Sequence, residues 1–215
     1  MTAPSTQDRI LDAAAELYLE RGFADTSLRE LTSRAGVNLS AVNYHFGSKE
    51  ALFDALVERL FDPINARRLA LLDALEAAGE PDLEEVLRAL VEPIVELRLQ
   101  DPRGARFLVQ VVNRLTGVTT GAVSSVERVF RETSVRFLAA ARRTLPPEAS
   151  DHLELRACWV SGAMLGTLLD THAFLEPGEG DEPEEHQQRV LDELVQFLAG
   201  ALRATSPTPR DRTKP

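Results

Sequence analysis

Residues 26–53, TSLRELTSRAGVNLSAVNYHFGSKEALF, contain the most specific local pattern in this 215-residue chain. Ser27 and Glu30 have the spacing of a capping box, in which each side chain bonds the other residue's free backbone amide at a helix start. A helix is therefore expected to begin after Ser27 and to end near Ala35, where a glycine follows.

A second short helix is expected directly after the first. Gly36 and Val37 form a tight turn, and Asn38 is a good N-cap because its side chain can accept a hydrogen bond from a free amide of the first turn. This helix ends near His45, before Gly47. Two short helices joined by a glycine-containing turn form a helix-turn-helix, whose second helix enters the major groove of DNA.

The side chains around this second helix divide into two sets. The inward-facing set is Leu31, Val37, Val42 and Phe46. The opposite face, where base edges would lie, carries Leu39, Ser40, Ala41 and Asn43. Asn43 is favoured for direct base recognition because its amide can pair with adenine N6 and N7. A role in capping or solvating the helix end is the alternative for Asn43.

The remainder of the chain has helical periodicity and essentially no strand pattern, which predicts an all-α fold. An N-terminal helix runs from about Thr6 to Arg21 and stops at Gly22. Asp62 and Pro63 indicate that a new helix, or a bend, begins at Pro63. The further helices are expected at residues 48–61, 63–78, 82–99, 103–115, 122–145, 147–174 and 184–204.

Composition limits the class of protein. Hydrophobic residues make up 44% and charged residues 27%, as in an ordinary folded domain. No basic run followed by an apolar stretch opens the sequence, and the longest uncharged apolar run, residues 157–169, is too short to span a bilayer. The single cysteine, Cys158, has no second thiol for a disulfide or a CxxC motif. We therefore expect a cytoplasmic protein with no membrane contact, cofactor or metal.

The net charge of −10 argues at first against a nucleic-acid partner, because phosphate neutralisation supplies most non-specific DNA affinity. The distribution of charge matters more. Residues 31–49 contain no Asp or Glu, whereas Arg34, His45 and Lys49 can supply positive charge. This part of the chain need not repel DNA, and backbone amides and hydroxyls can make phosphate contacts.

Residues 26–53 closely resemble the signature of the TetR family of transcriptional regulators, and the resemblance covers about residues 7–60. The signature is a helix, a turn, a recognition helix ending in aromatic-His-Phe, and a Ser-Lys-Glu-Ala-Leu helix start. It implies a three-helix DNA-binding domain at 1–50, a helical ligand-binding and dimerisation domain at 51–204, and a tail at 205–215 that we expect to be disordered. The implied function is a repressor that binds a palindromic operator as a homodimer and is released by its ligand.

The resemblance also implies roles around the recognition helix. Tyr44 and His45 are expected to contact phosphate. Lys49 is expected to do so too, because a cation at a helix N-terminus is unfavourable unless an anion bridges it to the free amides; a solvated Lys49 is the alternative. The expected DNA contacts are Thr26, Ser27, Arg29, Asn38, Leu39, Ser40, Ala41, Asn43, Tyr44, His45 and Lys49. Many family members carry an aromatic residue in place of Asn43 and a polar one in place of Leu39, so no operator sequence carries over.

Two C-terminal helices, at 147–174 and 184–204, are implied to form the four-helix bundle of the homodimer. The first is apolar almost all round between residues 157 and 169, as in a helix that neighbours cover on every side. The second carries an apolar face of Val190, Leu191, Leu194, Val195, Leu198 and Leu202. Packing within one chain is the alternative for both helices.

Aromatic and polar side chains between the signature and these helices are expected to surround a ligand cavity. The candidates are Phe107, Gln110, Asn113, Arg114, Phe130, Phe137, Trp159 and Met164. Ordinary core packing is the alternative for each of them. Residues 38–52 look most like the fatty-acid-responsive branch of the family, which implies a small apolar effector such as a fatty acid or acyl-CoA.

Two other classes of protein compete with a regulator. An enzyme is disfavoured, because the four histidines and Cys158 form no HExxH or nucleophile pattern and no glycine-rich phosphate loop is present. A helical interaction protein that no longer binds DNA is the second alternative, since residues 1–60 carry six basic and nine acidic side chains.

Overall fold

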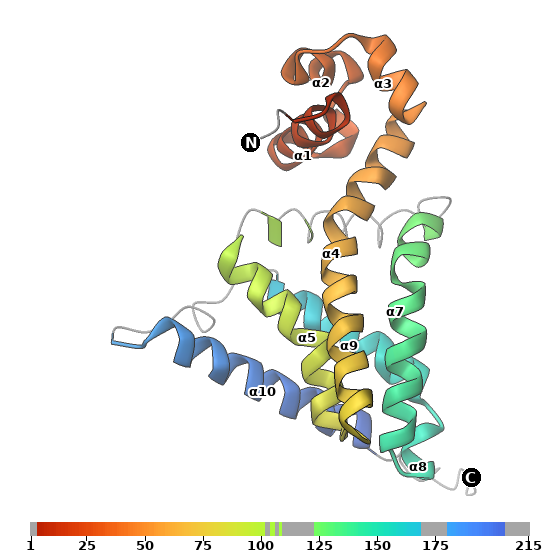
Figure 1. Ribbon diagram of the computed structural model, residues 1–215, viewed down its shortest axis with the longest axis vertical. Coiled ribbons are helices and arrows are strands. Elements are labelled where there is room, and N and C mark those ends of the chain that lie inside the picture. Colours follow the sequence, from red (N-terminus) through yellow and green to blue (C-terminus); the bar gives the residue numbers. More distant parts are fainter. Residues whose placement is uncertain (1–3, 102–103, 106–107, 109–122, 169–179, 205–215) are drawn as a thin grey trace, which may run out of the picture. The chain divides into compact units, whose positions relative to one another are not determined.

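The computed structural model describes residues 4–101, 104–105, 108, 123–168 and 180–204 (Figure 1). All regular elements within these ranges are helices, as the periodicity predicts. They are α1 (Thr6–Asp25), α2 (Leu28–Ala35), α3 (Leu39–Phe46), α4 (Lys49–Ala78), α5 (Leu83–Gln100), α7 (Val123–Thr144), α8 (Pro147–Ser150), α9 (Leu153–Leu168) and α10 (Pro183–Arg203). Among the helices so described, none is long and apolar enough to cross a membrane. Most of the helix expected at 103–115, and the tail at 205–215, lie outside the described residues.

The chain divides into two compact units. Unit 1 comprises Met1–Arg67 and Glu96–Glu132, and unit 2 comprises Arg68–Val95 and Thr133–Pro215. The division therefore falls inside α4, α5 and α7, and the first part of α4 groups with the helix-turn-helix. A functional boundary at residue 50 stays a prediction.

Three N-terminal helices and the start of α4 share one core in unit 1. Helix α1 packs on both α2 and α3, and α2 packs on α3. The core side chains with almost no exposed surface are Ile10, Leu17, Leu31, Val42, Leu52, Leu56 and Val57. The rings of Tyr18, Phe23 and Phe53 pack together with centroids 5.1–5.9 Å apart, so aromatic contacts hold α4 against α1.

The regular part of α1 ends at Gly22, the residue at which the sequence predicts that the helix stops. Gly22 adopts φ 81° and ψ 165°, which interrupts the regular helix before a last turn that extends to Asp25. A residue with a side chain rarely adopts this conformation, and glycine adopts it without steric cost. The chain direction therefore changes between α1 and α2 at a predictable residue.

Helix α4 runs through Pro63 without ending, so no new helix begins there. The bend, which was the other expectation at this residue, stays a prediction. The proline ring removes one backbone donor from the helix. Phe61 and Ile64, on either side of it, are both buried. Burial of two such side chains contributes about 1.5–3 kcal/mol each, which is enough to offset the roughly 3 kcal/mol that proline costs inside a helix.

The single helix expected at 147–174 is instead divided into α8 and α9. In a continuous helix the carbonyl oxygen of Ala149 would accept from the amide of Leu153. Here Nη1 of the buried Arg156 donates to that carbonyl at 2.9 Å and to the carbonyl of Leu202 at 3.2 Å. Asp151 and His152 form the turn between the two helices. Residues 169–174 of the expected helix lie outside the described residues.

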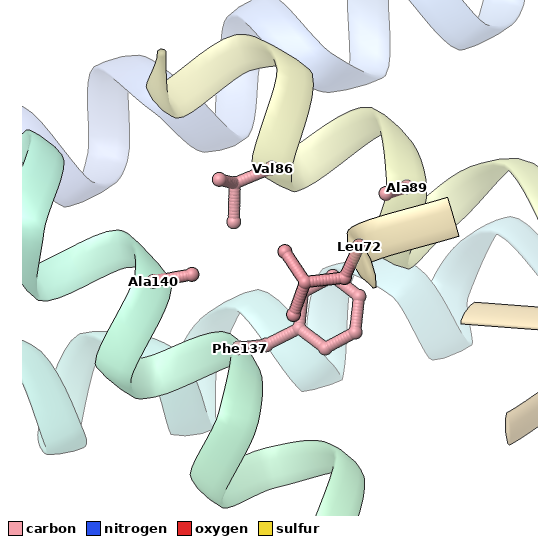
Figure 2. Close-up of a cluster of buried hydrophobic side chains, with 5 residues drawn as sticks. All are labelled: Leu72, Val86, Ala89, Phe137 and Ala140. Carbon is pink, nitrogen blue, oxygen red and sulfur yellow. The ribbon is translucent and has the colours of Figure 1, made fainter. Parts of the chain in front are cut away.

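Unit 2 has its own hydrophobic cluster, built from three helices (Figure 2). Leu72 comes from α4, Val86 and Ala89 from α5, and Phe137 and Ala140 from α7. Helix α9 packs against α10 in the same unit. Unit 2 is thus held together by helices from distant parts of the sequence.

Candidate DNA interface and C-terminal unit

The helix-turn-helix is built by local capping bonds. The hydroxyl of Ser27 accepts from the amide of Glu30 at 3.2 Å, and the amide of Ser27 donates to the Glu30 carboxylate at 3.0 Å, which confirms the predicted capping box. Gly36 ends α2 in the left-handed conformation with φ 63°. The side-chain oxygen of Asn38 accepts from the amide of Ala41 at 2.8 Å, so Asn38 is the N-cap of α3.

Helix α3 has one buried and one exposed side. Val42 has no exposed surface, whereas Tyr44 is 86% exposed and Leu39 is 50% exposed. The side chains of Ser40, Asn43 and His45 are also exposed, and that of Ala41 is half-buried. The structure thus presents most of the expected base-reading set together on one short helix. Val37 and Phe46, expected to face inward, are half-buried.

Thr26 does not belong to this exposed set. It is 2% exposed, and its hydroxyl donates to the carbonyl oxygen of Gly22 at 2.8 Å and lies 3.3 Å from that of Leu17. Its side chain therefore closes the end of α1 rather than facing solvent. The neighbouring Ser27 and Arg29, also expected to contact DNA, are exposed.

Lys49 is held against α1 instead of extending into solvent. Its Nζ lies 4.3 Å from the centroid of the Phe23 ring and donates to the carbonyl of Ala24 at 3.4 Å. A cation over an aromatic face is favourable because the ring carries negative charge on its face. The lysine remains partly exposed, in the first turn of α4.

Arg34 contributes less positive charge to this surface than the sequence suggests. Its guanidinium pairs with Glu20 at 3.0 Å and with Glu16 at 3.1 Å, and the hydrogen bonds that it donates to these carboxylates, Glu20 first, raise the pKa of Arg34. Arg21 similarly pairs with Glu30 at 2.6 Å. Each of these two arginines is thus paired with a nearby carboxylate, which offsets its positive charge.

Arg9 is a structural residue that the sequence analysis missed. Its Nη2 donates to the carbonyl oxygens of Ala35 and Gly36, at 2.6 and 2.8 Å. These carbonyls lie at the end of α2, where helix carbonyls have no intrahelical partner. Arg9 directly precedes the buried Ile10, so a basic residue beside the apolar face of α1 was the available clue.

Of the eight expected ligand contacts, the structure describes four, and these belong to two different units. Phe107, Gln110, Asn113 and Arg114 lie outside the described residues. Phe130 belongs to unit 1, where its ring packs at 4.6 Å on that of Phe61, and Phe137 belongs to the unit 2 cluster. Met164 is buried and Trp159 is 63% exposed. Their role in ligand binding stays a prediction.

Arg68 is a buried cation of unit 2 that the sequence analysis also missed. Its Nε donates to the carbonyl of Leu90 at 2.7 Å, and burial lowers the pKa of Arg68 to about 10. The clue is helical spacing, because position 68 follows the buried Phe61 and Ile64 on one face of α4 and precedes Leu72. Among the described residues, no three acidic, histidine or cysteine side chains are arranged to hold a metal ion.

Among the described residues, the side chains of helix α9 are buried on one side only. Cover of the other side by a second subunit stays a prediction. The buried side of α9 carries Leu153, Arg156, Val160 and Met164. Leu155, Cys158 and Trp159 are exposed, as is Phe197 on α10, at 65%. Within the part of the chain that the structure describes, the α9–α10 pair therefore carries exposed apolar side chains.

Comparison with known families identifies the family of this chain. A model described as bacterial regulatory proteins, tetR family, matches residues 10–56. A second, described as tetracyclin repressor-like, C-terminal domain, matches residues 88–201. The chain belongs to the TetR family. It is a DNA-binding transcriptional regulator, and the family assignment places it among regulators rather than enzymes.

Individual TetR-family relatives agree with this assignment. The chain is 36% identical over 108 residues to the probable regulator YttP of Bacillus subtilis, covering 50% of this chain and 51% of that protein. The match to YttP thus spans about half the length of that relative. The chain is also 25% identical over 202 residues to the regulator EthR of Mycobacterium tuberculosis, covering 93% of this chain and 89% of that protein.

A likeness to solved structures supports the fold. The fatty acid degradation regulator FadR from Bacillus halodurans matches with a TM-score of 0.66 and 15% identity, covering 94% of this chain and 99% of that chain. At this identity the likeness shows the fold alone. Regulators of the TetR family bind operator DNA and small effector molecules.

Proposed function

We propose that this chain is a ligand-released repressor that binds a palindromic operator as a homodimer, through the exposed face of α3. The observation that carries the proposal is the two-sidedness of that helix, with Val42 fully buried and Tyr44 almost fully exposed. A helix held in this way can enter the major groove with its exposed polar and apolar side chains facing the base edges. Such a repressor acts in the cytoplasm.

The proposed division of labour follows from exposure. Asn43 reads a base, Tyr44 and His45 approach phosphate, and Asn38 and Ser27 face DNA while capping their helices. Lys49 reaches phosphate by leaving the carbonyl of Ala24, because an ion pair with phosphate is stronger than a long bond from the ammonium to a neutral oxygen.

The proposed dimer is formed by α9 and α10 of each subunit. Trp159 and Phe197 support it, because large aromatic side chains on the surface are typical of association sites. We assign Trp159 to this interface rather than to the ligand cavity because most of its surface is exposed within the chain. Small residues beside it, Ser161 and Gly162, would allow close approach of a second helix.

The proposed effector is a fatty acid or acyl-CoA bound in the C-terminal part of the chain. The name of the similar FadR supports this class, and so does the buried guanidinium of Arg68, which would complement an anionic head group. An effector weakens operator binding only if it prefers the conformation that binds DNA poorly. Helix α4 is the proposed link, since it contributes Leu56 to the unit 1 core and Leu72 to the unit 2 cluster.

Selection from a random DNA pool tests the DNA-binding part of the proposal. The bound sequences should share a pseudo-palindrome with half-sites roughly 34–36 Å apart, and footprinting should show the same dyad. Enrichment of no sequence, or of a site without a dyad, would contradict the proposal.

Titration with palmitate and palmitoyl-CoA tests the effector separately. Either ligand should weaken binding to the selected duplex by roughly 5–150-fold, which corresponds to the usual coupling between two sites. Arg68→Met should reduce the affinity for palmitate while leaving that for hexadecanol unchanged. Tight binding of palmitate with no effect on the duplex would exclude this class as the releasing ligand.

A further inference from the structure

Leu39 is the first residue of α3 and lies half exposed beside the helix N-terminus. The N-terminal residues of a recognition helix are those that contact base edges. The position is locally fixed, because the adjacent Asn38 uses its side-chain oxygen to cap the amide of Ala41 at 2.8 Å. Leu39 therefore meets the groove at a defined place rather than on a fraying helix end.

The leucine side chain restricts which base it can meet. It has no hydrogen-bond donor or acceptor, so a guanine, cytosine or adenine edge against it would lose water without gaining a partner. Thymine alone offers an apolar group in the major groove, its C5-methyl. Contact with Leu39 would bury that methyl and leave no polar base atom unpaired.

The neighbours of Leu39 define where such a thymine would lie. Asn43 follows four residues later and is also exposed, so the two side chains lie on the same side of α3, about 5–6 Å apart. Base pairs are stacked about 3.4 Å apart along the duplex. Leu39 and Asn43 therefore address base pairs that are one or two steps apart.

We propose that Leu39 is a specificity-determining residue that contacts the C5-methyl of a thymine in each half-site, one or two base pairs from the pair that Asn43 addresses. This inference rests on the proposed reading of DNA by α3. It extends that proposal to a thymine, which Leu39 would recognise through an apolar contact rather than a hydrogen bond.

Replacement of thymine by deoxyuridine tests the inference, since it removes the methyl and keeps base pairing. The probe is the duplex that the wild-type protein selects from a random pool, with each symmetric pair of thymines replaced in turn. One pair should weaken wild-type binding by about fourfold per half-site, the effect of one buried methyl group, and by about fifteenfold in total. Leu39→Ala should bind the thymine and deoxyuridine duplexes equally.

Asn43→Ala is the matched control, because it alters the same side of α3 and keeps Leu39. It should retain the sensitivity to deoxyuridine. If no thymine pair is sensitive in the wild type, or if Leu39→Ala is equally sensitive, the inference is wrong while α3 still reads DNA. If no duplex is selected at all, the proposed function fails and Leu39 has no base to read.

Discussion

Nη2 of Arg9 donates to the carbonyl oxygen of Gly36 at 2.8 Å, joining the first turn of α1 to the turn of the helix-turn-helix. The same nitrogen donates to Ala35, so one guanidinium satisfies two carbonyls at the end of α2. A Cβ placed on Gly36 would lie 2.8 Å from this nitrogen. The left-handed conformation thus favours glycine at this position, and any side chain there would also have to displace the tip of Arg9.

Arg9→Ala should destabilise the DNA-binding domain and weaken operator binding. Hydrogen bonds to a charged group contribute about 1.5–3 kcal/mol, and the lower end applies here because Gly36 is exposed. Arg9→Lys should be less destabilising, since it keeps the charge but not the planar fork. Urea unfolding monitored by circular dichroism measures the difference. Equal stability of all three proteins would show that the interaction of Arg9 with these carbonyls contributes nothing.

Thr26→Val should lower the free energy of unfolding more than Thr26→Ser, which keeps the hydroxyl and loses only a methyl group. Valine has the same shape but leaves the carbonyl of Gly22 without the threonine hydroxyl, at a cost of about 1–3 kcal/mol. Under conditions where both variants are folded, the salt dependence of DNA binding should match that of the wild type. A shallower salt slope for Thr26→Val alone would instead support the phosphate contact predicted from the sequence.

The capping box of α2 predicts a specific acid sensitivity. Hydrogen bonds from the backbone amide and hydroxyl of Ser27 hold the pKa of Glu30 below its ordinary value of 4.5. The folded-state pKa is the lower one, so this contribution to stability is complete above pH 4.5 and is lost as the pH falls through the folded-state pKa. Glu30→Gln should flatten the stability profile in that acidic window. The same substitution in a Ser27→Ala background should change the profile less.

Asn43→Ala and Lys49→Ala should affect DNA binding in different ways. Asn43→Ala should relax base preference at one symmetric pair of positions, at a cost of about 1–3 kcal/mol for each bidentate pairing that it removes. Lys49→Ala should weaken binding to all sequences and reduce the salt slope by about 1 for each phosphate that Lys49 neutralises. Binding assays on the selected duplex and on scrambled DNA at several salt concentrations separate the two. Identical behaviour of both variants would refute the proposed division of labour.

Local patterns predicted the N-terminal part of the fold well. Ser27 with Glu30, Gly36 and Asn38 act through bonds to residues within a few positions, so their spacing alone predicts the caps that the structure contains. The sequence also predicted the exposed face of α3 through the burial of Val42.

Contacts between distant residues were not predictable in this way. Arg156 divides the expected helix at 147–174 because its guanidinium meets carbonyls of Ala149 and Leu202, the second from another helix. Thr26 was expected to contact DNA, yet its side chain is buried and its hydroxyl lies 3.3 Å from the carbonyl oxygen of Leu17, nine residues earlier in α1. Helix periodicity alone does not reveal which carbonyl groups the side chains of Arg156 and Thr26 contact.

Trp159→Glu and Phe197→Glu should each dissociate the proposed dimer. Both aromatic side chains are mostly exposed on the α9–α10 surface, where a second subunit would bury them and a buried carboxylate would lack a partner. Each substitution occurs twice in a symmetric interface, and an interface hot spot is worth at least about 2 kcal/mol, so the dissociation constant should rise about a thousandfold.

Val135→Glu is the matched control for these two substitutions, because Val135 is an equally exposed apolar residue on α7. It should remain dimeric in sedimentation equilibrium and keep its operator affinity. The aromatic variants should sediment as folded monomers and bind the selected duplex weakly, since each half-site then binds a separate subunit. Dimers of unchanged stability in both aromatic variants would place the interface on another surface, and dissociation of Val135→Glu would extend it to α7.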